Sequence, residues 1–136
     1  MRMDVTKTDS LPIRTSTDIV LIRQEVRKWT GELGFSLVDQ TKMITAASEL
    51  ARNSLDYGGG GTVHFESLQD GAKRGLRLIF DDQGPGIPDI AQALTDGFTS
   101  GKGMGLGLGG AKRLVNVFEI TSKVGEGTRV TITRWK

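Results

Sequence analysis

Glu49 and Asn53 are a pair of residues whose types and spacing could perform chemistry, and both occur in the string SELARNSLDYG. In a helix, residues four positions apart lie on one face. A carboxamide oxygen is a hard ligand that suits Mg2+, and a carboxylate can take a proton from a hydroxyl. The pair could therefore serve a metal-bound nucleotide. The alternative is a solvated helix face that also carries Arg52 and Asp56.

A second group lies in DDQGPGIPD, residues 81–89, directly after a predicted strand. Asp82 would sit where this strand leaves the sheet, and Gly84 and Gly86 would let the backbone turn beneath a flat ligand. A buried carboxylate that accepts a hydrogen bond from an exocyclic amine would select adenine. Because Asp, Gly and Pro are also ordinary turn residues, the segment alone is equally consistent with a plain turn.

The glycine-rich segment GKGMGLGLGG, residues 101–110, leads directly into AKRL. Glycine loses more backbone entropy on ordering than any other residue, so the segment favours neither a strand nor a helix interior. A helix that begins at about Gly105 or Leu106 would direct free N–H groups and its positive dipole end at an anion, for which phosphate is the leading candidate. The alternative is a flexible loop, since glycine-rich patterns also arise by chance.

A fourth segment, GEGT at residues 125–128, is a predicted hairpin turn that brings the Thr128 hydroxyl to the start of the last strand. Taken alone, it is simply a turn. All four segments nevertheless fall at the edges of predicted elements, and their joint occurrence in this order is far less expected by chance than any one of them. The combination favours a single site built from several element ends.

Three main helices are predicted from apolar spacing. The first has an N-cap among residues 16–18 and ends at Gly34, and the second runs from an N-cap at Asp39 to about Tyr57, where the glycines at 58–61 stop it. The third helix follows the glycine-rich segment, on the apolar positions Ala111, Leu114, Val115 and Phe118.

The strands complete the predicted architecture. Residues 1–10 are polar and expected to be frayed, and a short edge strand is expected at 11–15 because Pro12 lacks a donor. Antiparallel strands are expected at 62–68 and 76–82, joined by an Asp70–Gly71 turn, and again at 119–124 and 128–135. Residues 83–103 read as a long irregular segment with a possible short helix at 89–94. The element order predicts an α+β fold: a two-layer α/β sandwich with helices on one face of a mixed, largely antiparallel sheet.

Composition indicates one domain over residues 1–136, because 136 residues with 37% hydrophobic and 25% charged residues can bury a substantial core. The sequence contains no cysteine, which excludes disulfides and cysteine metal sites. With no signal peptide or long apolar run, we expect a cytoplasmic protein and no membrane partner. The 18 cationic and 16 anionic residues are interspersed, so a nucleic-acid partner is not indicated.

Four strings together resemble the N, G1, G2 and G3 boxes of the GHKL nucleotide-binding superfamily, which includes gyrase, Hsp90, histidine kinases and MutL. They are ExxRN at 49–53, DxGxG at 82–86, GMGLGL at 103–108 and GEGT at 125–128. The small size and the phrases TAASELARNSLDYGGGG and DGFTSGKGMGLGLGGAKRL more narrowly resemble the serine/threonine kinases of bacterial partner switching, in the anti-sigma regulatory factor family. The resemblance spans nearly the whole chain and implies a Bergerat-type ATP-binding fold.

The resemblance also implies roles for matching residues. Glu49 would be the general base and Asn53 the Mg2+ ligand. Asp82 would bind the adenine amino group of ATP, with Thr128 supporting it through a hydroxyl or a water. Residues 87–100 would form a lid. Gly84 and Gly86 would shape the wall beside the base, and the phosphates would be bound by backbone amides of Gly103, Gly105, Leu106 and Gly107.

By the same resemblance, the chain is expected to phosphorylate STAS-domain antagonist and scaffold proteins of a stressosome, and on release to activate a downstream phosphatase or other output enzyme. Two alternatives remain open: an anti-sigma factor that sequesters a sigma subunit, and an ATP-gated binding module that transfers nothing. Glu49 argues against the second, because binding alone needs no base.

Two other nucleotide-binding classes are excluded by the sequence. A P-loop is not expected, because Lys102 precedes Gly103 and no Ser or Thr follows a GK pair. The single histidine, His64, lies within a predicted strand, so a histidine kinase that acts on itself is not expected.

Overall fold

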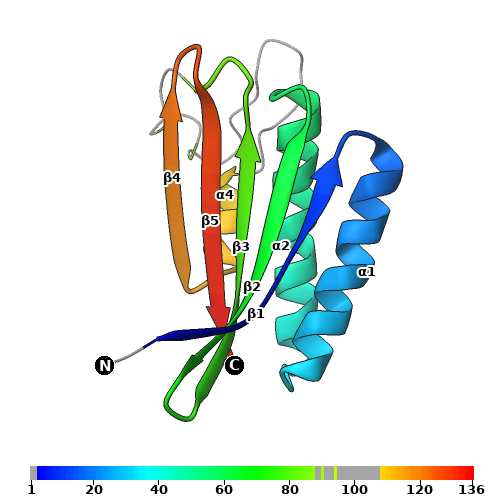
Figure 1. Ribbon diagram of the computed structural model, residues 1–136, viewed down its shortest axis with the longest axis vertical. Helices are drawn as coiled ribbons and strands as arrows, with labels where there is room; N and C mark the ends of the chain where they lie inside the picture. The colour runs from blue at the N-terminus through cyan, green and yellow to red at the C-terminus, as the bar shows by residue number, and fades with distance from the viewer. Residues whose placement is uncertain (1–2, 88–89, 91–93, 95–107) are drawn as a thin grey trace.

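In the part of the chain that the structure describes, three helices cover one face of a five-stranded sheet (Figure 1). The computed structural model describes residues 3–87, 90, 94 and 108–136. The elements follow the order β1 (Asp4–Ile13), α1 (Ser16–Glu32), α2 (Leu37–Asp56), β2 (Gly61–Asp70), β3 (Lys73–Asp82), α4 (Leu108–Arg113), β4 (Val117–Lys123) and β5 (Gly127–Trp135). This is the predicted α+β sandwich. None of the described helices is both long enough and apolar enough to span a membrane.

The sheet has the strand order β1-β2-β3-β5-β4, and each neighbouring pair is antiparallel. The largely antiparallel character is therefore confirmed, and no parallel pair occurs among the described strands. Alternate residues of the central strands point toward the helices and form the core with the apolar stripes of α1 and α2. The strand residues buried in this core include Val63, Phe65, Leu78, Phe80 and Ile132.

Helices α1 and α2 both begin earlier than predicted. Thr15, not one of residues 16–18, caps α1, because its extended backbone lets its hydroxyl accept from the Asp18 N–H while Asp18 accepts from the Thr15 N–H. Ser36 caps α2 and accepts from the Asp39 N–H at 3.1 Å. Asp39, the predicted N-cap, is thus the third residue of the helix. Tyr57 follows the last residue of α2, as predicted.

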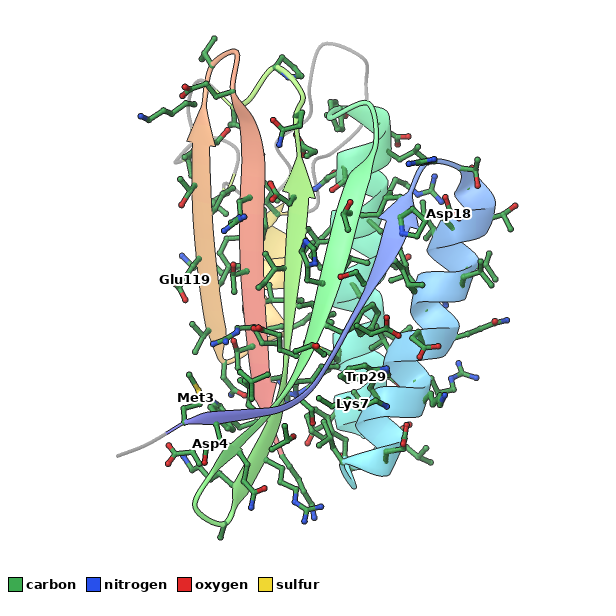
Figure 2. The ribbon with its side chains drawn as sticks, viewed as in Figure 1. Met3, Asp4, Lys7, Asp18, Trp29 and Glu119 are labelled. Carbon is green, nitrogen blue, oxygen red and sulfur yellow. The ribbon has the colours of Figure 1, made fainter. Side chains whose placement is uncertain are left out.

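Strand β1 is the clearest correction to the predicted elements. Residues 4–10 were expected to be frayed, but β1 pairs with β2 from Asp4 to Ile13. As an edge strand it exposes most of its side chains, so it lacks the apolar alternation that would have revealed it. Lys7 ties β1 to α1, with its Nζ 4.3 Å from the centroid of the Trp29 ring (Figure 2).

The third predicted helix is shorter than its apolar spacing suggested. Helix α4 ends at Arg113, and Phe118 lies in β4 opposite Ile132. The chain already joins the sheet at Asn116, whose N–H donates to the Thr133 carbonyl at 2.9 Å. The predicted helix start at Gly105 or Leu106 and most of the possible helix at 89–94 lie outside the described residues.

Candidate functional site

Helix α2 and strand β3 end, and strand β5 begins, at the same end of the sandwich (Figure 1). A cavity lies at this end. The antiparallel register brings the ends of the two strands together, since Asp82 pairs with Thr128. Six elements or segments contribute to the lining, which consists of Leu50, Asn53, Ser54, Tyr57, Gly58, Phe80, Asp82, Pro85, Gly86, Ile87, Leu108, Thr128 and Val130. Four predicted residues from three separate motifs thus meet here: Asn53, Asp82, Gly86 and Thr128.

Helix α2 presents Asn53 to this cavity because its buried stripe fixes the rotation of the helix. Residues such as Ala47, Leu50 and Ala51 are at most 1% exposed and face the core. Asn53 is half-buried at the cavity, and its carbonyl accepts from the N–H groups of Tyr57 and Gly58, where the helix ends. Glu49 lies one turn earlier on α2, is exposed, and is not among the lining residues. The structure thus brings Asn53 to the cavity, and the role of Glu49 stays a prediction.

Asp82 is the last residue of β3 and is only 9% exposed. Its Oδ1 accepts from the Gly84 N–H at 2.9 Å and from the Thr128 N–H at 3.2 Å. Burial raises the pKa of the Asp82 carboxyl above its ordinary value, the two backbone N–H groups oppose this shift, and the charge of Asp81 adds to it. No ion pair joins Asp82 to a cation among the described residues. Within residues 3–87, 90, 94 and 108–136, the carboxylate is therefore buried and held by backbone donors alone.

Glycines around Asp82 permit contacts that a larger residue would block. A Cβ at Gly58 would overlap the Asp82 carboxyl, and a Cβ at Gly84 would lie 2.5 Å from the Gly58 Cα. Gly86 has a φ of 80°, and a Cβ there would overlap the Lys123 carbonyl. Gly84 thus lies beside the carboxylate and Gly86 lines the cavity, while their predicted role as a wall beside a base stays a prediction. Gly58 was missed, because the glycines at 58–61 were interpreted only as the stop of a helix.

Ser122 was also missed by the sequence motifs. Its Oγ accepts from the Ile87 N–H at 2.8 Å and lies 2.8 Å from Thr128 Oγ1 and 3.1 Å from the Gly127 carbonyl oxygen. The hydroxyl therefore joins the β4–β5 hairpin to the segment that follows β3. A serine within a predicted strand carries no sequence signal for such a role.

Most of the glycine-rich segment lies outside the residues that the structure describes. Gly103, Gly105, Leu106 and Gly107 lie outside the described residues, as does most of the predicted lid. Leu108, the next described residue, begins α4, is 2% exposed and lines the cavity. Helix α4 packs on α2. Leu108, near the end of the glycine-rich segment, therefore lines the same cavity as Asn53.

Among the described residues, no group of three or more His, Cys, Asp or Glu side chains could hold a metal ion by itself. The donors near the cavity fit Mg2+ bound jointly with a phosphate, because Mg2+ commonly takes only one or two protein oxygens and completes its shell with phosphate and water. Asn53, which lines the cavity, has one such oxygen in its side chain, and its role as a Mg2+ ligand stays a prediction. His64 lies in β2, as predicted, with Nδ1 2.7 Å from Ser10 Oγ.

Comparison with known sequences agrees with this geometry. The profile of the histidine kinase-, DNA gyrase B- and HSP90-like ATPase family matches residues 38–136. The serine/threonine-protein kinase RsbT of Bacillus subtilis (strain 168) is 48% identical over 123 residues, which are 90% of this chain and 92% of RsbT. The matched residues 38–136 of the family profile include all four of the predicted site segments.

Solved structures share the fold at lower identity. The RsbU and RsbW domains of Rv1364c from Mycobacterium tuberculosis are similar with a TM-score of 0.66 and 23% identity, over 96% of this chain and 33% of that one. This chain thus spans about a third of that structure. The catalytic domain of the histidine kinase ThkA has a TM-score of 0.53 and 14% identity, over 95% of each chain. The chain therefore belongs to the histidine kinase-, DNA gyrase B- and HSP90-like ATPase family, as a serine/threonine-protein kinase similar to RsbT.

Proposed function

We propose that this kinase binds ATP with Mg2+ in the cavity between α2, β3 and β5, and phosphorylates a STAS-domain protein of a stressosome-type partner-switching module. The observation that carries the proposal is the buried Asp82 carboxylate, which shares one cavity with Asn53 and with Leu108 at the end of the glycine-rich segment. Asp82, Asn53 and Leu108 come from three separate motifs, and a nucleotide site requires them together.

Asp82 recognises the adenine base in this proposal. Two backbone N–H groups hold Oδ1, so the carboxylate is oriented before a ligand arrives. A carboxylate accepts from the adenine amino group but meets only another acceptor at O6 of guanine. Because Asp82 is buried, an unpaired acceptor there would be costly, and this favours ATP over GTP.

Asn53 and the amides of the glycine-rich segment hold the triphosphate. In this proposal the carboxamide oxygen of Asn53, in the last turn of α2, is a Mg2+ ligand, and backbone amides of Gly103, Gly105, Leu106 and Gly107 bind phosphate oxygens. Bound Mg2+ supplies neutralisation of the charge on the phosphates. The protein then has to hold the γ-phosphate and the attacking hydroxyl in line. Such positioning, together with charge neutralisation, accounts for most of the rate enhancement in phosphoryl transfer.

Glu49 acts as the general base. It lies one turn before Asn53 on the same flank of α2 and is exposed, so a hydroxyl on a partner protein can reach it. The serine or threonine oxygen bonds to the γ-phosphorus while the bond to the β-phosphate oxygen breaks. Glu49 takes the hydroxyl proton, and ADP leaves with the electron pair.

We infer from the similarity to RsbT that STAS-domain antagonist and scaffold proteins are the substrates, and we expect the kinase to work in the cytoplasm. On release from them, the kinase would activate a downstream phosphatase or another output enzyme. The sequence left open the alternative that the protein sequesters a sigma factor. No feature of the described residues favours this alternative. The RsbW-containing structure shares only the fold at 23% identity.

The test mixes the protein with radiolabelled ATP, Mg2+ and candidate STAS-domain proteins. We expect wild type to label one of them, and Glu49→Gln to bind ATP normally while transfer falls by about 100-fold or more, the usual contribution of a general base. Glu119→Gln is the matched control, because Glu119 is an exposed carboxylate on β4, far from α2 (Figure 2).

If Glu49→Gln transferred the phosphoryl group at a near-normal rate, Glu49 would not be the general base. Binding of ATP by wild type without transfer to any STAS-domain protein would favour the ATP-gated binding module and contradict the kinase mechanism. Labelling of a sigma-factor antagonist together with tight capture of a sigma subunit would favour the anti-sigma alternative.

A further inference from the structure

A second cavity lies at the other end of the sandwich, where α1 ends and β3 begins. It has a volume of about 290 Å³ and is lined by Thr6, Lys7, Trp29, Glu32, Leu33, Ser67, Leu68, Gln69 and Arg74. Arg74 stands near the start of β3 and Asp82 at its end, so the length of this strand separates the second cavity from the first. The two linings have no residue in common.

The helix-facing side of the sheet changes from apolar to polar at this cavity. Along β2, Phe65 belongs to the core, whereas Ser67 and Gln69, which follow on the same face, line the cavity. The register places Lys7 opposite Ser67 and Arg74 opposite Gln69. Polar side chains of three neighbouring strands therefore continue the rows that form the core elsewhere.

Ser67 is a buried polar residue of this lining, with an exposed fraction of 6%. The pairing of β1 with β2 shifts at Thr6, whose hydroxyl donates to the Ser67 carbonyl at 3.3 Å. The hydroxyl of Ser67 itself has no hydrogen-bond partner among the residues that the structure describes. Because a buried hydroxyl that stays unpaired destabilises the folded protein, this group is available to a molecule in the cavity.

Two cationic side chains flank Ser67. Figure 2 shows Lys7 beside Trp29, and Lys7 Nζ lies 3.7 Å from Glu32 Oε1. The charge of Lys7 is thus matched within the lining. The Arg74 side chain is exposed and forms no hydrogen bond or ion pair with a residue inside the described ranges. The cavity therefore has one positive charge that the surrounding protein leaves unmatched.

These unpaired groups suit a carboxylate. A guanidinium binds a carboxylate through two parallel hydrogen bonds, and a serine hydroxyl can donate one more. Arg74 is the diagonal neighbour of Ser67 across the β2–β3 pair, and Cβ atoms so related lie about 7–8 Å apart, within reach of a long side chain. Leu33, Leu68 and Trp29 supply the apolar part of the lining. A dianion would bring a second charge that Arg74 alone does not match.

We propose that the second cavity binds a small organic carboxylate that carries an apolar group. Arg74 binds the carboxylate, Ser67 donates to one of its oxygens, and the apolar residues contact the rest of the molecule. Because the site lies at the opposite end of β3 from Asp82, binding is independent of the nucleotide. The proposal therefore goes beyond the kinase function and does not rest on it.

The test uses the full chain, isotope-labelled for NMR, with phenylacetate and phenylacetamide, which have nearly the same shape and differ in charge. Trp29 lines the cavity and Trp135 does not, so the indole N–H resonance of Trp135 is an internal reference. We expect phenylacetate to shift the Trp29 resonance to saturation and phenylacetamide to bind about 10-fold more weakly. Saturating ATP and Mg2+ should leave the phenylacetate dissociation constant unchanged.

Arg74→Gln should raise the dissociation constant of phenylacetate by about 10-fold and leave that of phenylacetamide unchanged. Arg27→Gln is the matched control, because Arg27 is an exposed arginine of α1 outside the lining, and it should change neither constant.

Ser67→Ala should weaken phenylacetate binding by about 5-fold, the effect of one lost hydrogen bond. It should not lower the midpoint of urea unfolding, because the hydroxyl that it removes is unpaired among the described residues. A lowered midpoint would show that the hydroxyl is bonded within the protein and would overturn its role in the site.

Equal binding of the two probes, or phenylacetate binding that Arg74→Gln leaves unchanged, would overturn the carboxylate site. So would the absence of a Trp29 shift with phenylacetate, benzoate and isovalerate, each at about 10 mM, where even a weak charged contact is detectable. Binding of inorganic phosphate in place of all three carboxylates would contradict the class of ligand. Wild type that binds phenylacetate but not ATP would contradict the proposed kinase function and leave this inference standing.

Discussion

Asp39 and Asp82 lie toward opposite ends of the same sandwich, and their surroundings move their pKa values in opposite directions. Asp39 is in the first turn of α2, and its Oδ1 accepts from Arg134 Nη2 at 2.6 Å. That hydrogen bond lowers the pKa of Asp39 below its ordinary value, against the smaller effect of burial. Burial instead raises the pKa of Asp82, at the end of β3. The register of β3 with β5 separates the two ends of the sheet, since Asp82 pairs with Thr128 and Leu76 with Arg134.

The partners of the two carboxylates explain what each one does. Arg134 also donates to the Leu114 carbonyl at 2.8 Å, so the pair with Asp39 joins the start of α2, the end of α4 and β5. Asp82 instead accepts from two backbone N–H groups, is in no ion pair with any residue that the structure describes, and is surrounded by glycines that bring the backbone close. A carboxylate that is neutralised by a cation holds elements together. A buried carboxylate without a cation is left available for a donor on a ligand.

The largest expected effect comes from Asp82→Asn. An amide can still accept from Gly84 and Thr128 but presents an NH2 group to the adenine amine, so we expect ATP affinity to fall by about 10- to 100-fold and the preference over GTP to disappear. Titration calorimetry with both nucleotides measures this directly. A retained preference for ATP would refute the adenine role of Asp82.

The same variant should not lose stability without nucleotide. Because the pKa of Asp82 is raised in the folded state, its carboxyl favours folding below the unfolded pKa of about 3.9, and this contribution is lost as pH rises through the folded value. At neutral pH the buried charge is a cost, so Asp82→Asn should be as stable as wild type or more stable. Urea unfolding at pH 7 tests this, and a marked loss would mean that Asp82 is a structural residue like Asp39.

Gly58→Ala should give the next largest effect. The added Cβ would overlap the Asp82 carboxyl, so either the carboxylate or the end of α2 must move. We expect overpacking to cost about 1–3 kcal/mol of stability and to weaken ATP binding in parallel. Thermal unfolding with and without ATP measures both quantities.

Gly31→Ala is the control for that variant. Gly31 lies in α1, and a Cβ there would meet no atom within 4 Å. Replacement of a helical glycine by alanine should stabilise the protein by about 0.5–1 kcal/mol and leave ATP binding unchanged. Normal ATP binding by Gly58→Ala would show that the contact between Gly58 and Asp82 does not position the carboxylate.

The sequence could predict the ends of elements where local chemistry marks them. Asp82 follows an apolar strand, and Asn53 lies on a helix with a clear apolar stripe, so both were placed correctly, and the sandwich followed from the element order. Strand β1 was missed because its stability comes from pairing with β2 and not from its own pattern. Ser122 and Gly58 were missed because their neighbours, Ile87 and Asp82, are 35 and 24 positions away in the chain.

Asp39→Asn should give the smallest effect, and it should depend on pH in the sense opposite to Asp82→Asn. The lowered pKa means that Asp39 contributes stability above the unfolded pKa of about 3.9, and this contribution is lost as pH falls through the folded value. The variant should therefore be less stable than wild type at pH 7, and the difference should shrink as the pH falls below the unfolded pKa of about 3.9. Urea midpoints at several pH values test this, with Glu119→Gln as an exposed control that should follow wild type throughout. A difference that stayed constant down to pH 3 would show that Asp39 acts through the shape of its hydrogen bond to Arg134, and the contrast between the two carboxylates would then no longer be one of charge.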